Sequence, residues 1–197
     1  MSPNARRLAA PLAAFLIGLA ALGAAAYWTF VPGAGGSSAS GIGGPFRLVD
    51  GDGRAVTEKD FAGSPHLVFF GFTHCPDICP TKLFELSEMF RAMGDKGKGI
   101  RAIFVTVDPE RDTPAVMKSY VASFDPCIVG LTGDRAEIDR VTREFRAYAK
   151  KVPLKDGDYT MEHTALIYLM GKDGRFVGSF NVERGPDAAA KDLLART

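Results

Sequence analysis

The sequence predicts an α/β domain in which a central mixed sheet is flanked by helices. Three observations predict it. Continuous apolar runs such as HLVFFGF (66–72) and RAIFVTV (101–107) are typical of strands that are buried on both faces. Segments with apolar residues at helical spacing alternate with these runs. Glycine-rich turn signals separate the elements. Strands that alternate with helices and then end in a hairpin indicate one mixed sheet, which we place in a single domain at residues 46–197.

The first half of this domain has three further local signals. FRLVDGDGRAVT (46–57) predicts a hairpin, because an Asp-Gly-Asp-Gly turn joins two short extended runs. TKLFELSEMFRAMG (81–94) predicts a helix that ends at its glycine, because four of its apolar residues recur at helical spacing. DTPAVMKSYVASF (112–124) predicts the next helix, with Thr113 as the N-cap and Pro114 in the first turn.

The second half continues the same alternation. CIVGL (127–131) predicts a short apolar strand, and residues 134–149 a helix. HTALIYLM (163–170) and GRFVGSF (174–180) predict two strands joined by a Gly-Lys-Asp-Gly turn, and a last helix follows Gly185-Pro186. This order of elements matches a thioredoxin-like fold.

The N-terminus predicts a membrane anchor. Residues 8–31 contain no charged side chain, and as a helix they would span about 36 Å, enough for a tilted crossing. Arg6 and Arg7 precede the span, so we expect residues 1–7 to be cytoplasmic and the domain to be exported. Residues 32–45 form a Gly/Ser-rich linker. A single-pass protein of the bacterial inner membrane with its C-terminal domain in the periplasm is expected, and a cleaved signal peptide is the alternative.

Charge gives little support to nucleic-acid binding. The formal net charge is +1, and both basic residues of the first 45 positions precede the apolar span. The remaining chain carries nearly equal numbers of basic and acidic residues without a basic stripe. We therefore expect no nucleic-acid partner.

Two of the three cysteines, Cys75 and Cys79, follow the strand predicted at 66–72. Pro80 suits the first turn of a helix, so Cys79 is expected at or next to the N-cap, where the helix dipole favours a thiolate. A disulfide here would close a very short loop and stabilise the fold little. Three residues separate the cysteines, where a typical thioredoxin-like redox pair has two. The spacing alone leaves a redox pair and a metal site open.

His163 favours the metal site. It opens an apolar run that the predicted topology places beside the cysteines. Two thiolates and an imidazole suit copper, Cu(I) especially, whereas a structural zinc site usually has a fourth ligand. Glu162 either orients the histidine or is simply solvated.

Three blocks of the sequence, FGFTHCPDICPT, VTVDPERDTP and YTMEHTALIYL, together resemble the Sco/SenC family of membrane-tethered copper proteins with a thioredoxin-like fold. The resemblance covers roughly residues 46–196. It implies that Cys75, Cys79 and His163 are ligands for Cu(I), Cu(II) or both. It also implies that Asp108 supports the site or recognises a partner. The family usually has Asp directly before the ligand histidine, where this chain has Glu162, so the position of this carboxylate relative to the histidine is expected to differ.

The resemblance also implies a function. A metallochaperone without turnover would assist assembly of the binuclear copper centre of cytochrome c oxidase. The implied partners are the copper-bearing subunit of that oxidase and other copper chaperones. A thiol-disulfide reductase that maintains the cysteines of that centre is the alternative, with a copper or redox sensor as a third.

Five other residues receive plainer interpretations. His66 is expected to be structural and His74 not to be a ligand. Cys127 is expected to be a buried free thiol. Arg111 and Asp112 either belong with Asp108 or form a local ion-paired turn.

Overall fold

The computed structural model describes residue 18, residues 41–155 and residues 157–197. The anchor predicted at 8–31 lies outside the described residues except for Gly18, and the linker at 32–45 is described only from residue 41. No helix in the described part of the chain is long and apolar enough to cross a membrane.

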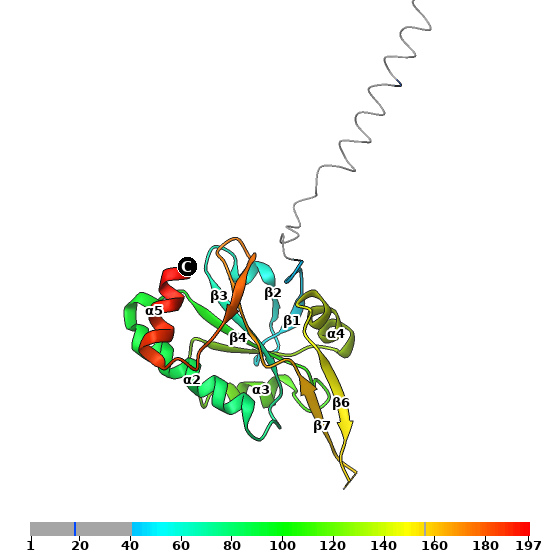
Figure 1. The fold of residues 1–197 in the computed structure, drawn as a ribbon. Helices are drawn as coiled ribbons and strands as arrows, with labels where there is room; N and C mark the ends of the chain where they lie inside the picture. Colours follow the sequence, from blue (N-terminus) through cyan, green and yellow to red (C-terminus); the bar gives the residue numbers. More distant parts are fainter. Residues whose placement is uncertain (1–17, 19–40, 156) are drawn as a thin grey trace, which may run out of the picture. The chain divides into compact units, whose positions relative to one another are not determined.

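A five-stranded mixed sheet forms the centre of the domain (Figure 1), as predicted. Its order is β5-β4-β3-β8-β9. The first three of these strands are parallel, β8 is antiparallel to β3, and β9 is antiparallel to β8. The strands are β3 (His66–Gly71), β4 (Arg101–Thr106), β5 (Ile128–Leu131), β8 (Ile167–Met170) and β9 (Phe176–Phe180). All six residues of β3 are buried, so the continuous apolar run marks the central strand.

Four helices pack around this sheet: α2 (Ile78–Met93), α3 (Pro114–Val121), α4 (Arg135–Glu144) and α5 (Pro186–Arg196). Helix α2 lies side by side with α5, and α3 packs on β5 (Figure 1). Residues 41–197 also contain two short 3-10 helices, η1 (Glu58–Phe61) and η2 (Gly94–Gly97). Thr113 caps α3 as predicted, because its Oγ1 accepts a hydrogen bond from the backbone N–H of Val116 at 3.4 Å.

Two hairpins lie outside the central sheet. The first, β1 (Arg47–Val49) with β2 (Ala55–Thr57), was predicted from its turn. The second, β6 (Ala149–Pro153) with β7 (Tyr159–His163), was not predicted.

The second hairpin corrects two predicted boundaries. The helix predicted over 134–149 ends at Glu144, because Arg146 adopts a positive φ of 51° that a right-handed helix does not allow. The strand predicted over 163–170 begins only at Ile167, and His163 is instead the last residue of β7. The histidine therefore comes from a hairpin in which Met161 is the one buried strand residue.

Candidate metal centre

The two cysteines lie where β3 ends and α2 begins, at the carboxyl end of a central parallel strand, which is where sites gather in open α/β sheets. Asp77 is the N-cap of α2, so Cys79 lies within the first turn, slightly beyond the predicted position. The backbone N–H of Cys79 donates to Cys75 Sγ at 3.4 Å. Cys79 is fully buried and Cys75 half-buried, and both thiols are free.

Gly71 makes room for the inner thiol. A Cβ atom at this position would lie 2.7 Å from Cys79 Sγ and 2.6 Å from a ring carbon of Phe104, both far too close. Burial raises the pKa of the Cys79 thiol well above its ordinary value, and a backbone hydrogen bond at Phe72 lowers it only in part. Burial therefore opposes the thiolate expected at the helix start and favours the protonated thiol in the metal-free chain. A metal ion that binds this sulfur must displace its proton.

His163 faces the cysteines from the hairpin. Its Nε2 lies 3.6 Å from Cys79 Sγ, and its Nδ1 lies 3.1 Å from the carbonyl oxygen of Thr164. A proton on Nδ1 would be donated to that carbonyl and would leave Nε2 free as a ligand atom. The rings of Phe69 and Phe72 pack against the imidazole at 6.4 and 5.7 Å between centroids. Burial lowers the pKa of His163, which favours the neutral imidazole that metals require.

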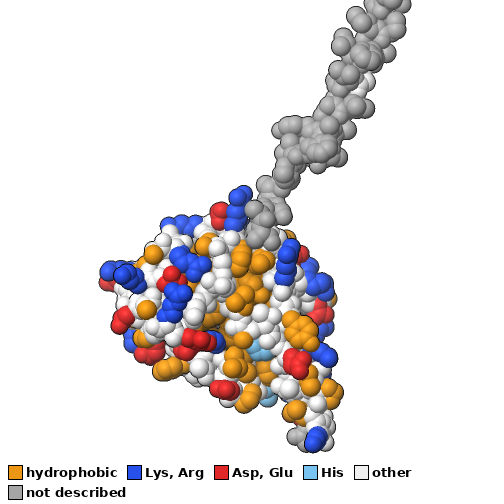
Figure 2. All heavy atoms as spheres, in the orientation of Figure 1, with side chains coloured by type: hydrophobic (Ala, Val, Ile, Leu, Met, Phe, Trp, Pro, Cys, Tyr) orange, Lys and Arg blue, Asp and Glu red, His pale blue; other side chains and the backbone are white. Residues whose placement is uncertain are grey.

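The structure thus brings together the three residues predicted as ligands. One ligand atom from each of Cys75, Cys79 and His163 lies within 4.8 Å of the others. Among the described residues, these three are the only cysteine, histidine or acidic side chains grouped closely enough to hold a metal ion together. Figure 2 shows histidine side chains that reach the surface among hydrophobic ones. Two sulfurs and one imidazole nitrogen form a soft donor set, which fits copper.

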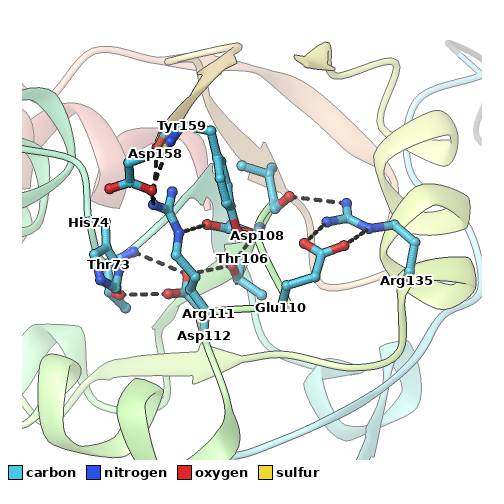
Figure 3. A network of polar contacts seen from close by, with 11 residues as sticks. Thr73, His74, Thr106, Asp108, Glu110, Arg111, Asp112, Arg135, Asp158 and Tyr159 are labelled. Atoms are coloured by element: carbon cyan, nitrogen blue, oxygen red, sulfur yellow. Dashed lines mark hydrogen bonds and ion pairs between the residues drawn. The ribbon is translucent and has the colours of Figure 1, made fainter. Parts of the chain in front are cut away.

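Asp108 is fully buried and belongs to a network of polar contacts (Figure 3). Its carboxylate pairs with Arg111 Nε and accepts a hydrogen bond from the hydroxyl of Tyr159 at 2.9 Å. Arg111 also donates to the carbonyl oxygen of Tyr159 at 3.0 Å and lies over its ring, 3.7 Å from the centroid. Asp108 therefore contacts the first residue of the strand that ends in His163. Its supporting role stays a prediction.

The contact of Asp112 with the loop before Cys75 was not predicted from the sequence. Asp112 is fully buried, and its carboxylate accepts hydrogen bonds from the backbone N–H of Thr73 at 3.1 Å and from the hydroxyls of Thr73 and Thr106. The local ion-paired turn of Arg111 with Asp112 is wrong, because Arg111 pairs with Asp108 and Asp158. No spacing in the sequence indicates a contact between Thr73 and a residue 39 positions away.

The other predicted site residues lie at the margin. Glu162 is exposed and accepts a hydrogen bond from the hydroxyl of Tyr148 at 3.5 Å. Neighbouring residues of a strand point to opposite faces, so Glu162 and His163 diverge. Whether Glu162 supports the site stays a prediction. His74 is exposed, with its Nδ1 3.2 Å from Thr73 Oγ1, and it does not belong to the group of three.

Two further expectations concern residues away from the group. His66 is buried at the start of β3, where its ring lies 5.4 Å from that of Phe61, as a structural residue would. Cys127 is a free thiol as expected, but it is half-buried and not buried, and it lies just before β5.

Comparison with known proteins supplies relatives over the same region. The family model SCO1/SenC matches residues 34–197. The mitochondrial protein SCO1 homolog of Mus musculus is 43% identical over 157 residues, which cover 78% of this chain and 55% of the mouse protein. The chain spans about half the length of such curated relatives.

Solved structures share the fold. Bradyrhizobium japonicum ScoI with copper bound is 62% identical, with a TM-score of 0.76 over 79% of this chain and 99% of that one. BsSco, described as a member of the Sco family of cytochrome c oxidase assembly proteins with a disulfide switch, is 28% identical. Its TM-score is 0.61, over 77% of this chain and 90% of that one. The thioredoxin-like arrangement predicted from the sequence is therefore confirmed.

Proposed function

This chain belongs to the SCO1/SenC family, and on that premise we propose that it is a copper metallochaperone that assists assembly of the binuclear copper centre of cytochrome c oxidase. The observation that carries the proposal is the approach of three soft ligand atoms, from Cys75, Cys79 and His163, to within 4.8 Å of one another. Copper-bound B. japonicum ScoI supports the choice of metal, and the description of BsSco supports the role in oxidase assembly.

The burial of the ligands suits a cargo that must leave again. Cys79 is fully buried, whereas Cys75 and His163 are half-buried, so an ion held by all three would be approachable from one side. Ile78 and Leu166, which flank the ligands in the sequence, are exposed and offer an apolar rim to the copper-bearing subunit of the oxidase or to another copper chaperone. A partner's ligands would replace those of this chain one at a time on the open side.

A membrane anchor completes the proposal. The 24 uncharged residues at 8–31 behind Arg6 and Arg7 support a single-pass protein of the bacterial inner membrane with the copper domain in the periplasm. Fractionation tests this directly: the chain should stay with membranes after a carbonate wash and should be digested by protease added to intact spheroplasts. Release by carbonate, or protection from the protease, would contradict it.

Copper titration tests the binding site. The reduced full chain, in detergent and without oxygen, should bind one Cu(I) ion. Cys75→Ser, Cys79→Ser and His163→Ala should each weaken that binding, while Cys127→Ser should match the wild type because Cys127 lies outside the group of three. Unchanged stoichiometry and affinity in the His163→Ala variant would refute the three-ligand site.

A thiol-disulfide reductase is the second candidate, favoured by two free thiols four positions apart at the start of α2, where Cys75 Sγ accepts a hydrogen bond from the backbone N–H of Cys79. The step would oxidise the thiols of Cys75 and Cys79 to a disulfide while a recipient disulfide gains two electrons and two protons. Disulfide exchange by the metal-free chain separates the two functions. Rapid exchange that ignores both copper and His163→Ala would favour the reductase.

A further inference from the structure

Two buried carboxylates of the segment Asp108–Asp112 bond to Thr73 and to Tyr159 (Figure 3). Thr73 lies in the loop before Cys75, and Tyr159 begins the strand that ends in His163. We propose that Asp112 and Asp108 are positioning residues, which hold the cysteine loop and the histidine hairpin at the spacing that copper requires. The inference rests on the proposed copper-binding function and adds two residues that do not touch the metal.

Asp112 holds the cysteine loop. Its Oδ2 accepts from the backbone N–H of Thr73, and its Oδ1 accepts from the hydroxyl of Thr73, two residues before Cys75. The same carboxylate accepts from the hydroxyl of Thr106, the last residue of β4. One fully buried carboxylate therefore ties the loop that follows β3 to the end of the neighbouring strand. Because each of its oxygens is already engaged, a shift of Thr73 leaves a buried charge short of donors.

The other bonds of this loop are local or involve the ligand sulfurs, as does the backbone hydrogen bond of Phe72 to the Cys79 thiol. Between the end of β3 and the start of α2, the backbone N–H of Cys75 donates to the carbonyl of Phe72 at a long 3.3 Å. The backbone N–H of Cys79 donates to Cys75 Sγ. Because this acceptor is the ligand atom itself, the bond does not fix the position of Cys75. The position of Cys75 relative to the sheet thus depends strongly on Thr73 and its carboxylate partner.

Asp108 holds the histidine hairpin through a different set of contacts. The hydroxyl of Tyr159 donates to it at 2.9 Å, and Arg111 bridges it to the carbonyl oxygen of Tyr159. Tyr159 and His163 are the first and last residues of β7, so these contacts fix the strand that carries the imidazole. The guanidinium of Arg111 also lies 6.0 Å from the ring of Phe72, which in turn packs edge-on against His163.

The cysteine side is tested with Thr73→Val, which keeps the shape of the side chain but removes its hydroxyl. Cu(I) affinity should fall about 10- to 100-fold, as for other changes to residues that orient metal ligands. Thr73→Ser, which keeps the hydroxyl, should restore it. Thr142→Val is the matched control, because it removes a buried threonine hydroxyl that bonds to the backbone of α4 at 2.7 Å, away from the metal site.

The histidine side is tested with Tyr159→Phe, which keeps the ring beneath Arg111 and removes the hydroxyl bound to Asp108. The ring resonances of His163 in the NMR spectrum of the metal-free chain should shift, and copper should dissociate faster. Tyr148→Phe is the control on the same hairpin, because its hydroxyl contacts the exposed Glu162 and not Asp108. Its His163 resonances should match those of the wild type.

Spectra separate positioning from general loss of stability. In Cu(II)-loaded chains, Thr73→Val should shift the thiolate-to-copper absorption band, and Thr142→Val should leave that band unchanged at a similar unfolding midpoint. Wild-type affinity, spectra and His163 resonances in both Thr73→Val and Tyr159→Phe would overturn the positioning role. Copper that stays bound after Cys75→Ser and His163→Ala would instead overturn the proposed function.

Discussion

The position of the Cys79 sulfur depends on the residues packed directly around it. Cys79 is fully buried, its Sγ lies 3.6 Å from His163 Nε2, and Gly71 leaves the space that its sulfur occupies. The raised pKa of its thiol means that proton and metal compete for the same atom. The site is therefore sensitive to small changes in volume next to this sulfur.

Gly71→Ala should damage the site more than the fold. The new Cβ would meet Cys79 Sγ at 2.7 Å, so we expect the thiol to move and Cu(I) affinity to drop about tenfold or more, roughly 1.4 kcal/mol. Overpacking should also lower the free energy of unfolding by about 1–3 kcal/mol. Gly130→Ala is the control, because its Cβ would meet Val121 at 2.9 Å in the same sheet without touching the thiol. Equal copper affinity in the two variants would contradict the role of Gly71.

His66 should make the stability of the metal-free chain depend on pH. Burial lowers its pKa in the folded state, so between its ordinary value near 6.5 and that lower value the unfolded chain binds a proton that the native chain does not. The contribution of His66 is complete above pH 6.5 and is lost as the pH falls below it, with a slope of at most about 1.4 kcal/mol per pH unit. Urea unfolding at pH 7.5 and 5.0 should show a smaller loss in His66→Gln than in the wild type. The same loss in both would contradict this.

At the residue scale, the sequence predicted the three ligands and named Asp108 as a supporting residue, but it did not predict the contacts made by Gly71 and Asp112. Cys75, Cys79 and His163 were predictable because their ligand chemistry is visible in the residue type itself. Gly71 and Asp112 were not, because their roles depend on contacts with Cys79 and Thr73 that only the folded chain makes.

Among the elements, the β6–β7 hairpin is the one that the sequence did not reveal. Only Met161 of its ten strand residues is buried, so its strands lack the apolar periodicity by which the buried strands were recognised. Helix α2, in contrast, buries the four apolar residues that predicted it: Leu83, Leu86, Phe90 and Met93. The elements that build the core can be predicted from the spacing of their apolar residues. The hairpin that carries His163 is instead held by the pairing of its two strands and by the contacts of Tyr159 with Arg111 and Asp108.

Destabilising helix α4 should lower the free energy of unfolding without changing the affinity for copper. Asp134 is its N-cap and accepts a hydrogen bond from the backbone N–H of Glu137 at 2.8 Å. Asp134→Ala should lower the free energy of unfolding by about 1 kcal/mol, and Asp134→Asn, which keeps a capping oxygen, should lose less. Copper affinity should be unchanged in both variants. A large loss of copper in Asp134→Ala would mean that α4 supports the site.

At the scale of the whole molecule, two of the three free thiols are assigned to copper and the third is not. Copper should therefore protect Cys75 and Cys79 from alkylation, and Cys127 should still react, slowly because burial raises its pKa. Mass spectrometry of labelled peptides from loaded and metal-free chains checks this pattern. Protection of Cys127 by copper would contradict the assignment.

X-ray absorption at the copper edge of the reduced, Cu(I)-loaded full chain tests the three-ligand site most directly. The wild type should show two sulfur scatterers and one imidazole nitrogen. His163→Ala should lose the imidazole signal and keep both sulfurs, in keeping with the positions of Cys75 and Cys79 on α2 and its preceding loop. A wild-type spectrum with a third sulfur, or one left unchanged by His163→Ala, would contradict a site built from Cys75, Cys79 and His163.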